Sequence, residues 1–248
     1  MRRKQLKRTE EAKIRHFFDG ESKSYQEVLD GNPGVNYVNE VEKNIVSRLL
    51  EKCTGDSFLD IGMGTGRFTS LLRSRGYNVM GTDLSIEMLI AYQSPISLFN
   101  ANAISLPIRD ERFDQLICMR TLKYVTELES ALHEFNRVLK PGGYAIVQFA
   151  NKFSYQFFLK ILPGVGNRIY NDILFLRSHR ELQEMIKRAG FTIAVMKNNI
   201  RIPFFIYGRI KKYKSLKPFI YIERKLDKLL PQYLLARDFI FLLRKPLD

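Results

Sequence analysis

The 248-residue sequence is poor in residues that often carry enzyme chemistry, with two cysteines, three histidines and no tryptophan. Cys53 and Cys118 are too far apart for a metal motif, so we predict no metal site and reduced thiols. No apolar run approaches the roughly 18–20 residues that cross a bilayer. The basic first 18 residues also lack the apolar stretch of a secretory signal. Together these absences predict a cytoplasmic protein.

Acidic residues are also scarce, with 26 Asp and Glu against 40 Lys and Arg and a net charge of +14. The excess lies at the two ends of the chain. Residues 1–18 carry +5 and residues 196–248 carry +9, whereas residues 19–195 are neutral. Charge placed in this way favours an anionic partner for the ends over one for the middle, and a solvated basic surface is the plainest alternative.

Between the basic ends, strand-like and helix-like segments alternate. Apolar residues at helical spacing in 39–52 lead into an apolar strand at 58–61. Further helices are expected at 68–76, 85–93 and 178–190, and one that begins at 128 and is stopped by Pro141 and Gly142. Further strands are expected at 77–83, 97–103, 112–120, 144–150, 191–198 and 238–245. This alternation predicts an α/β fold, a doubly wound and mostly parallel seven-stranded sheet with helices on both faces.

We expect three parts: a basic N-terminal arm or cap (1–39), a core (40–199) and a basic, aromatic tail (200–248) that also supplies the last strand. Within the tail, Phe219, Ile222, Leu226, Leu229 and Leu230 fall on one stripe of an amphipathic helix, opposite four charged residues. The plainest interpretation is that this stripe packs on the core. A second aromatic-rich insert spans residues 151–176.

The stretch "LDIGMGTGRF" places a glycine turn between the first strand and a helix. Gly62, Gly64 and Gly66 alternate, and Arg67 stands where a dinucleotide fingerprint has its third glycine. Asp60 directly precedes the turn. A carboxylate there would repel a pyrophosphate but attract an ammonium group. The turn therefore suits the amino-acid end of S-adenosylmethionine better than a dinucleotide.

The next two strands supply candidate contacts for the rest of such a ligand. Asp83 ends the second strand, 21 residues after Gly62, where an acid can accept hydrogen bonds from both ribose hydroxyls. Leu84 could cover the face of an adenine ring. After the third strand, Asn102 and Ala103 lie where the adenine edge is expected, and the Asn102 amide could pair with it.

Four ordered blocks, "LDIGMGTGRF", "VMGTDLSIEML", "NANAISLPIRDERFDQLICM" and "RVLKPGGYAIV", resemble the class I, Rossmann-like S-adenosylmethionine-dependent methyltransferases. The resemblance covers residues 40–195 and is nearest to the branch with small-molecule and lipid acceptors. It implies S-adenosylmethionine as cofactor and the following contacts: Asp60, Gly62, Gly64 and Gly66 at the methionine moiety, Asp83 at the ribose, Asn102 and Ala103 at the adenine, and Met119 beside the cofactor. Tyr25 resembles an N-terminal tyrosine that closes over the cofactor in some relatives.

The chain departs from the family after the fourth strand, where "MRTLKYV" replaces a segment that has a histidine in many relatives. Methyl transfer needs alignment of the acceptor more than a nucleophile. The candidates at this rim are Arg120, which could hold an acidic group of the acceptor, and Tyr124, which could orient or deprotonate a hydroxyl. A solvated arginine and a packed tyrosine are equally consistent with the sequence.

Two interpretations of the basic, aromatic ends remain. In one, residues 151–176 and 200–237 form an apolar lid over a small or lipid-like acceptor, with Phe153, Phe157, Phe158, Phe204, Phe205 and Tyr207 as its apolar residues, and the cations contact an anionic inner membrane surface. In the other, Lys211, Lys212, Lys214 and Arg224 bind the phosphates of an RNA acceptor. A non-catalytic cofactor-binding module and a dehydrogenase are alternatives of other classes. We favour methyl transfer to a small-molecule or lipid-like acceptor.

Overall fold

The computed structural model describes residues 10–22, 31–155 and 175–247. Seven strands form one sheet in the order β3-β2-β1-β4-β5-β7-β6. Their bounds are β1 Ser57–Ile61, β2 Asn78–Asp83, β3 Ser97–Asn100, β4 Phe113–Cys118, β5 Leu139–Ala150, β6 Thr192–Asn198 and β7 Asp238–Arg244. The first five pair in parallel, and β7 is antiparallel to both β5 and β6. The predicted doubly wound, mostly parallel sheet is confirmed.

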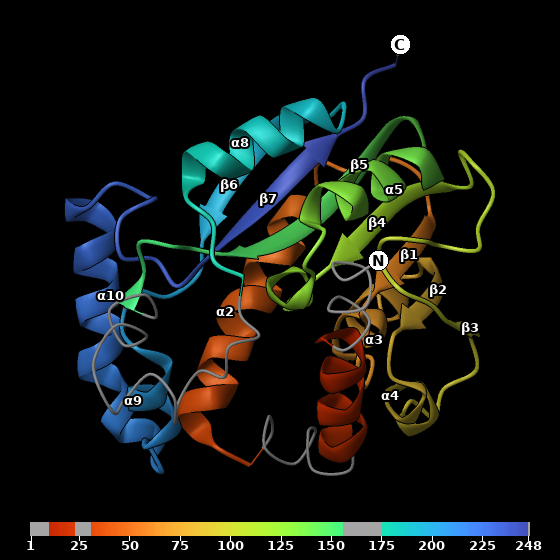
Figure 1. The fold of residues 1–248 in the computed structure, drawn as a ribbon. Helices are drawn as coiled ribbons and strands as arrows, with labels where there is room; N and C mark the ends of the chain where they lie inside the picture. Colours follow the sequence, from red (N-terminus) through yellow and green to blue (C-terminus); the bar gives the residue numbers. More distant parts are fainter. Residues whose placement is uncertain (1–9, 23–30, 156–174, 248) are drawn as a thin grey trace.

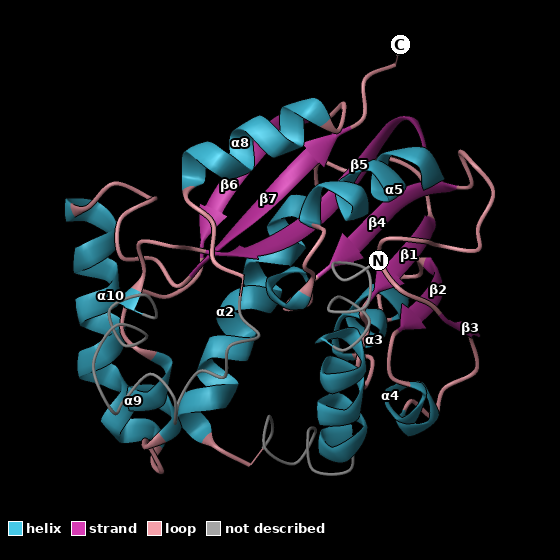
Figure 2. Cartoon of the chain, in the orientation of Figure 1, coloured by secondary structure: helices cyan, strands magenta, loops and turns pink. Residues whose placement is uncertain are grey.

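Helices cover both faces of the sheet (Figures 1 and 2). Their bounds are α2 Pro33–Leu50, α3 Arg67–Arg73, α4 Ile86–Ala91, α5 Leu128–Val138, α8 His179–Arg188, α9 Phe204–Gly208 and α10 Lys217–Leu229, with the 3-10 turns η1 Leu122–Tyr124 and η2 Tyr213–Leu216. Side chains of β1 alternate between the two faces. Leu59 packs with α5 and α8 in one core cluster, and Phe58 packs with α2 and α3 in the other. Burial on both faces stabilises the parallel strands, whose carboxyl ends all lie at the same edge of the sheet.

Two helix boundaries differ from the sequence prediction. Helix α5 ends at Val138, and β5 begins at the next residue, Leu139, which is fully buried and pairs with Phe113 of β4. The predicted helix, which Pro141 and Gly142 were expected to stop, therefore ends slightly earlier, because burial of Leu139 and its pairing with β4 favour an extended backbone. Helix α2 begins at Pro33, capped by the side chain of Asn32, and so crosses the expected boundary at residue 39.

A small unit of α9, η2 and α10 packs on α2 beside the sheet. Tyr207 is fully buried there, and its hydroxyl donates to Glu223 of α10 (2.9 Å). Gly34 of α2 lies so close that a Cβ on it would be 1.9 Å from the Tyr207 carbonyl oxygen. Tyr207 is thus a core residue of this unit, not an apolar lid residue. Of the predicted lid residues in the insert, Phe153 is exposed, and Phe157 and Phe158 lie outside the described residues.

The apolar stripe of α10 is split by the fold. Phe219 and Leu226 pack against the unit's core, but Ile222 and Leu229 are 44% and 76% exposed. The inward face includes the buried Glu223, and at 3.6 residues per turn Ile222 and Leu229 point about 100° and about 120° away from it. The prediction that the whole stripe packs on the core is wrong for Ile222 and Leu229.

The N-terminal helix (residues 10–22) lies at the edge of the sheet toward which β1, β2 and β4 point (Figure 1). Ile14 is buried, the Phe18 ring meets the Tyr124 ring edge-on at 5.1 Å, and Asp19 accepts a hydrogen bond from the Ser85 hydroxyl (2.5 Å). This helix therefore covers the loops that follow the parallel strands. Among the described residues, no helix combines the length and the apolar composition that crossing a bilayer requires.

Candidate active site

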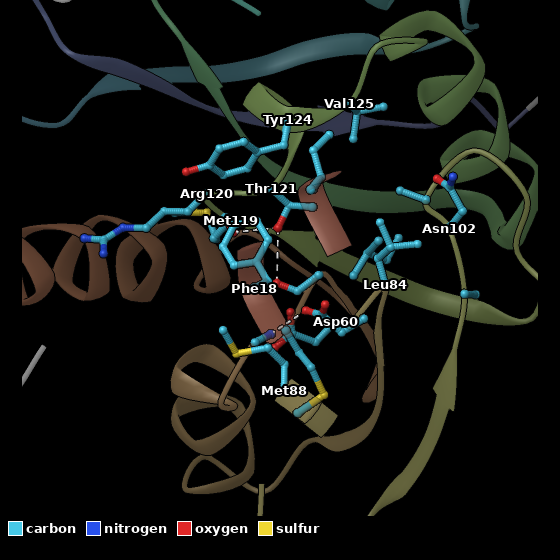
Figure 3. Close-up of a pocket in the computed structure, with 18 of the residues that line it drawn as sticks. Phe18, Asp60, Leu84, Met88, Asn102, Met119, Arg120, Thr121, Tyr124 and Val125 are labelled. Carbon is cyan, nitrogen blue, oxygen red and sulfur yellow. Dashed lines mark hydrogen bonds between the residues drawn. The ribbon is translucent and has the colours of Figure 1, made fainter. Parts of the chain in front are cut away.

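A cavity of about 300 Å³ lies where β1, β2 and β4 end, beneath the N-terminal helix (Figure 3). This position follows the rule that open parallel sheets bind ligands beyond the carboxyl ends of their strands. Ten of the predicted site residues line it: Asp60, Gly62, Gly64, Asp83, Leu84, Asn102, Ala103, Met119, Arg120 and Tyr124. Gly66 is not part of the lining, and Tyr25 lies outside the described residues.

The three glycines of the turn all have left-handed φ angles, but they face different surroundings. A Cβ on Gly62 would meet Thr121, 2.2 Å away, and one on Gly66 would meet the Tyr92 ring at 2.1 Å. A Cβ on Gly64 would meet no heavy atom within 4 Å. Gly64 therefore borders the open cavity, whereas Gly66 is required for packing against Tyr92.

Asp60 lies near the end of β1 and is only 2% exposed. Burial raises the pKa of its carboxyl to about 7, and the nearby Asp83 adds to this, although a hydrogen bond from the Thr69 hydroxyl (2.6 Å) opposes it. Holding this carboxylate ionised in an apolar wall is unfavourable without a cation beside it. The cavity thus contains a buried acid whose charged form a protonated amine would stabilise.

Asp83, the last residue of β2, organises the loops around it. One carboxylate oxygen accepts from the Gly64 N–H (2.8 Å) and the other from the Ser85 N–H (2.9 Å), and burial raises the pKa of the carboxyl. Across the cavity, the Asn102 side-chain oxygen accepts from the Ile104 N–H (3.2 Å). These bonds orient both side chains, and each oxygen keeps a second lone pair for a ligand.

Arg120 follows β4 with a left-handed φ of +59°, an uncommon conformation for a residue with a side chain. Its guanidinium donates to Glu42 (2.9 Å) and to Asn39 (2.8 Å) of α2 and points away from Leu84 and Asn102 (Figure 3). The structure thus places Arg120 in the cavity wall, with its charge directed to α2.

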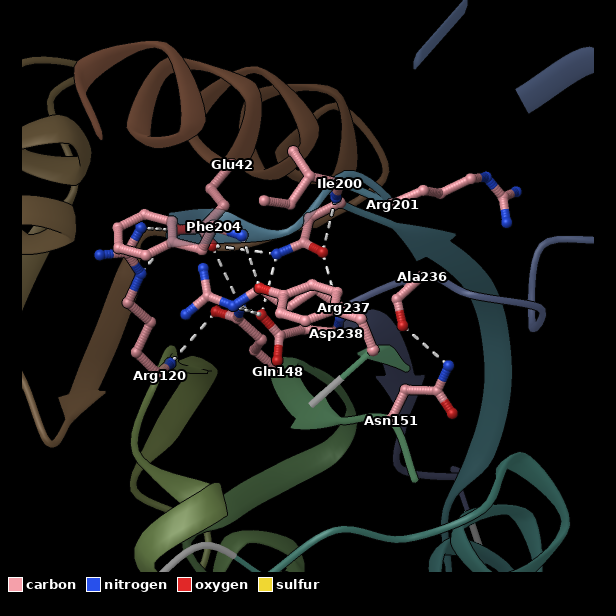
Figure 4. A network of polar contacts seen from close by, with 12 residues as sticks. Glu42, Arg120, Gln148, Asn151, Ile200, Arg201, Phe204, Ala236, Arg237 and Asp238 are labelled. Carbon is pink, nitrogen blue, oxygen red and sulfur yellow. Dashed lines mark hydrogen bonds and ion pairs between the residues drawn. The ribbon is translucent and has the colours of Figure 1, made fainter. Parts of the chain in front are cut away.

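Glu42 is the centre of a buried polar network behind this wall (Figure 4). It accepts hydrogen bonds from Arg67 (2.8 Å), Arg120, Gln148 (3.1 Å) and Asn199 (3.2 Å). Burial alone would raise the pKa of Glu42, but the charges of Arg120 and Arg67 outweigh it and hold the pKa well below its ordinary value. Glu42 thereby ties the start of α3 to the loop after β4.

Sequence reasoning missed this network, although one signal was present. The buried residues of α2 recur at helical spacing, as Val35, Val38, Val46 and Leu49, and Glu42 occupies the remaining position of that stripe. A charged residue within an apolar stripe indicates a buried partner of opposite charge.

Tyr124 lies in η1 at the apolar end of the cavity, against Phe18. Burial raises the pKa of its hydroxyl. Tyr124 is therefore suited to orienting a ligand as a neutral phenol and poorly suited to removing a proton from it. Ile14 and Phe18 of the N-terminal helix complete this end of the cavity; their short apolar segment within a basic arm had suggested no site. Among the described residues, no group of three His, Cys, Asp or Glu side chains is placed to hold a metal ion.

Comparisons with known proteins show the family of the chain. Residues 59–147 match a family described as "Methyltransferase domain". An uncharacterized protein of Methanocaldococcus jannaschii is 31% identical over 202 residues, which cover 81% of this chain and 90% of that protein. A ubiquinone/menaquinone biosynthesis C-methyltransferase of Methylococcus capsulatus is 26% identical over 209 residues, covering 72% and 83%.

A solved structure shows the same fold. Magnesium protoporphyrin IX methyltransferase from Synechocystis, solved with bound S-adenosylhomocysteine, superposes with a TM-score of 0.66 at 15% identity over 94% of this chain and 99% of that one. The ordered sequence blocks, the sheet order and the family match therefore agree. The chain belongs to the class I S-adenosylmethionine-dependent methyltransferases and is an enzyme that uses S-adenosylmethionine as its methyl donor.

Proposed function

We propose that this enzyme methylates a small, apolar acceptor that binds beside Phe18 and Tyr124, with the methyl donor between Asp60 and Asn102. The observation that carries the proposal is the contrast between the two ends of one cavity. One end has a buried carboxylate whose pKa is about 7, and the other is closed by apolar and aromatic side chains of the N-terminal helix.

The residues fit the donor as follows. Asp60 pairs with the donor's ammonium group, Gly64 leaves room for its amino-acid end, and Asp83 accepts from the ribose hydroxyls with its remaining lone pairs. Asn102 and Ala103 meet the adenine edge. Leu84 and Met119 cover apolar surfaces of the donor. When bound, the donor supplies an electrophilic methyl group on a sulfonium.

The remaining residues act on the acceptor and on water. Phe18 and Ile14 exclude water from the reacting atoms, and the neutral Tyr124 hydroxyl orients the acceptor by a hydrogen bond. Arg120, whose guanidinium is held by Glu42 and Asn39, shapes the wall of the cavity and is not directed at the acceptor. Alignment at short distance is the main contribution that such a site makes to an in-line displacement.

Several relatives favour an apolar ring as the acceptor, since they are named as quinone or demethylmenaquinone methyltransferases. The proposal for this enzyme names only a class of acceptor, an apolar ring, and not a particular compound. An acceptor of this kind dissolves in lipid, so we also propose that the enzyme works in contact with an anionic lipid surface, and not on RNA.

Two measurements test the proposal. Calorimetric titration with S-adenosylhomocysteine should give saturable binding, and NADH should give none. Purified enzyme with methyl-labelled S-adenosylmethionine should then label a lipid-soluble quinone or phenol fraction. Label that appears only in the RNA fraction, or tight binding of NADH, would overturn the proposal.

A further inference from the structure

The outward surface of α10 and its flanks, residues 209–235, differs from the rest of the molecule in charge. Eight exposed cations lie here: Arg209, Lys211, Lys212, Lys214, Lys217, Arg224, Lys225 and Lys228. The exposed acid in this stretch, Asp227, is bonded to Arg201 (3.1 Å) and Asn198 (3.1 Å). The surface is therefore strongly positive, and its acid is directed toward the protein.

Apolar side chains project between these cations. Tyr221 is 62% exposed, and Ile222 and Leu229, seven residues apart on one side of the helix, are exposed as described above. The Lys225 ammonium lies 5.5 Å from the Tyr221 ring centre. The inward face of α10 is formed by Glu223, Phe219 and Leu226, and within the described part of the chain these outer apolar groups remain exposed.

We propose that this outer face of α10 is a docking surface for an anionic lipid bilayer. Lysines beside aliphatic and aromatic groups on one helix face suit the bilayer interface, because the apolar groups enter the acyl boundary while the ammonium groups remain at the lipid phosphates. The inference depends on the proposed function only for the reason why the enzyme would bind a membrane. Binding of α10 to a bilayer does not depend on which acceptor the enzyme methylates.

Two other occupants fit this face less well. RNA would pair with the cations and stack on Tyr221, but Ile222 and Leu229 gain little from bases. A second copy of the chain would bring like charges together, since the face carries cations of one sign. A bilayer favours both kinds of side chain, because the aliphatic groups are buried in hydrocarbon and the lysines contact lipid phosphates.

The position of α10 is also suited to this role. Figure 1 shows α10 and the N-terminal helix on the side of the sheet toward which the parallel strands point. The cavity opens at the same ends of the strands, beneath the N-terminal helix. Helix α10 and the cavity therefore lie beyond the same edge of the sheet.

The experiment is co-sedimentation of the full-length protein with vesicles of phosphatidylglycerol and phosphatidylcholine, or of phosphatidylcholine alone. Binding to the anionic vesicles should weaken with salt. The triple variant Lys217→Gln, Lys225→Gln, Lys228→Gln should bind about 100-fold more weakly, at roughly fivefold per lysine. A matched triple at exposed cations elsewhere, Lys52→Gln, Arg73→Gln, Lys187→Gln, removes the same charge and should change affinity less than about fivefold.

A second pair of variants separates docking from charge alone. Ile222→Ser with Leu229→Ser should weaken vesicle binding about tenfold or more. Ile90→Ser, at an isoleucine of α4 that is 67% exposed, should not weaken it. The proposal would be overturned if both triple variants lost the same vesicle affinity, or if the protein bound neutral and anionic vesicles equally. It would also be overturned if the first triple variant abolished RNA binding while its vesicle binding persisted. S-adenosylhomocysteine titration of the same variants keeps this result distinct from failure of the proposed function.

Discussion

Replacing Asp60 with asparagine tests the central electrostatic argument. In the ligand-free enzyme, burial raises the pKa of this carboxyl to about 7. Below that pH the group is protonated, so binding a protonated amine must release one proton. We therefore expect S-adenosylhomocysteine to bind about tenfold more tightly per pH unit from pH 5.5 to near 7, since one proton per unit corresponds to about 1.4 kcal/mol. Above pH 7 the affinity should level off.

The same group has the opposite effect on the stability of the ligand-free protein. Because its folded pKa is raised from 3.8 to about 7, its contribution to stability is complete below pH 4 and is lost as pH rises through 7. That loss is about 4 kcal/mol at most. Asp60→Asn removes the buried charge and should therefore stabilise the ligand-free enzyme at pH 8. It should also weaken S-adenosylhomocysteine binding by 100-fold or more, about 3 kcal/mol, because the ligand's amine then lacks a partner.

The assay is calorimetric titration at several pH values, in buffers of different ionisation enthalpy, so that proton release is measured directly. Thermal unfolding of both proteins gives the stability difference. Thr69→Val, which removes the hydrogen bond to the carboxylate but keeps the charge, should preserve the pH slope and move it to higher pH. An Asp60→Asn variant that keeps wild-type affinity, or a wild-type affinity independent of pH, would refute the reasoning.

Three further predictions follow from the site. Gly66→Ala should lower the free energy of unfolding by about 1–3 kcal/mol, because its Cβ meets an aromatic ring, whereas Gly64→Ala should cost only about 1 kcal/mol of strain yet weaken S-adenosylhomocysteine binding. Equal losses in urea denaturation would contradict this. Glu42→Gln should lower the free energy of unfolding by about 3–5 kcal/mol, since it leaves two arginines without a buried counter-charge. Glu223→Gln should lower it by only about 1–2 kcal/mol, because the Glu223 carboxylate accepts from backbone N–H groups and a phenol. A larger loss for Glu223→Gln than for Glu42→Gln would contradict the role given to the Glu42 network. Tyr124→Phe should leave S-adenosylhomocysteine affinity within about twofold but lower turnover about 10–100-fold once an acceptor is identified, and unchanged turnover would remove the orienting role.

The fold and the meeting of the strand-end residues at one cavity could be predicted from the sequence because local patterns determine them. Asp60, Gly62, Gly64 and Asp83 each lie at or beside a strand end, and parallel strands bring such ends together at one edge. The order of the segments was therefore sufficient to place these residues around one cavity.

The other end of the cavity depends on contacts between segments far apart in sequence. Phe18 meets Tyr124 across more than a hundred residues, and no periodic pattern in the basic arm indicates this. Arg120 was assigned to an acceptor because the sequence does not show that Glu42 lies behind it. The outer residues of α10 were assigned to the core because the sequence shows which residues of a helix form an apolar stripe, but not which of them a neighbouring element buries.

The placement of β7 has a consequence for how the enzyme is made. The segment 238–244 fills the gap between β5 and β6, and Asp238 at its start accepts from Gln148 (3.0 Å) and Asn199 (2.9 Å) behind the cavity wall. Until that segment leaves the ribosome, two strand edges remain open to wrong pairing and the wall lacks one of its anchors. Synthesis of the sheet's last strand and onset of catalysis should therefore coincide, so a nascent chain halted before residue 238 would be inactive and prone to aggregate.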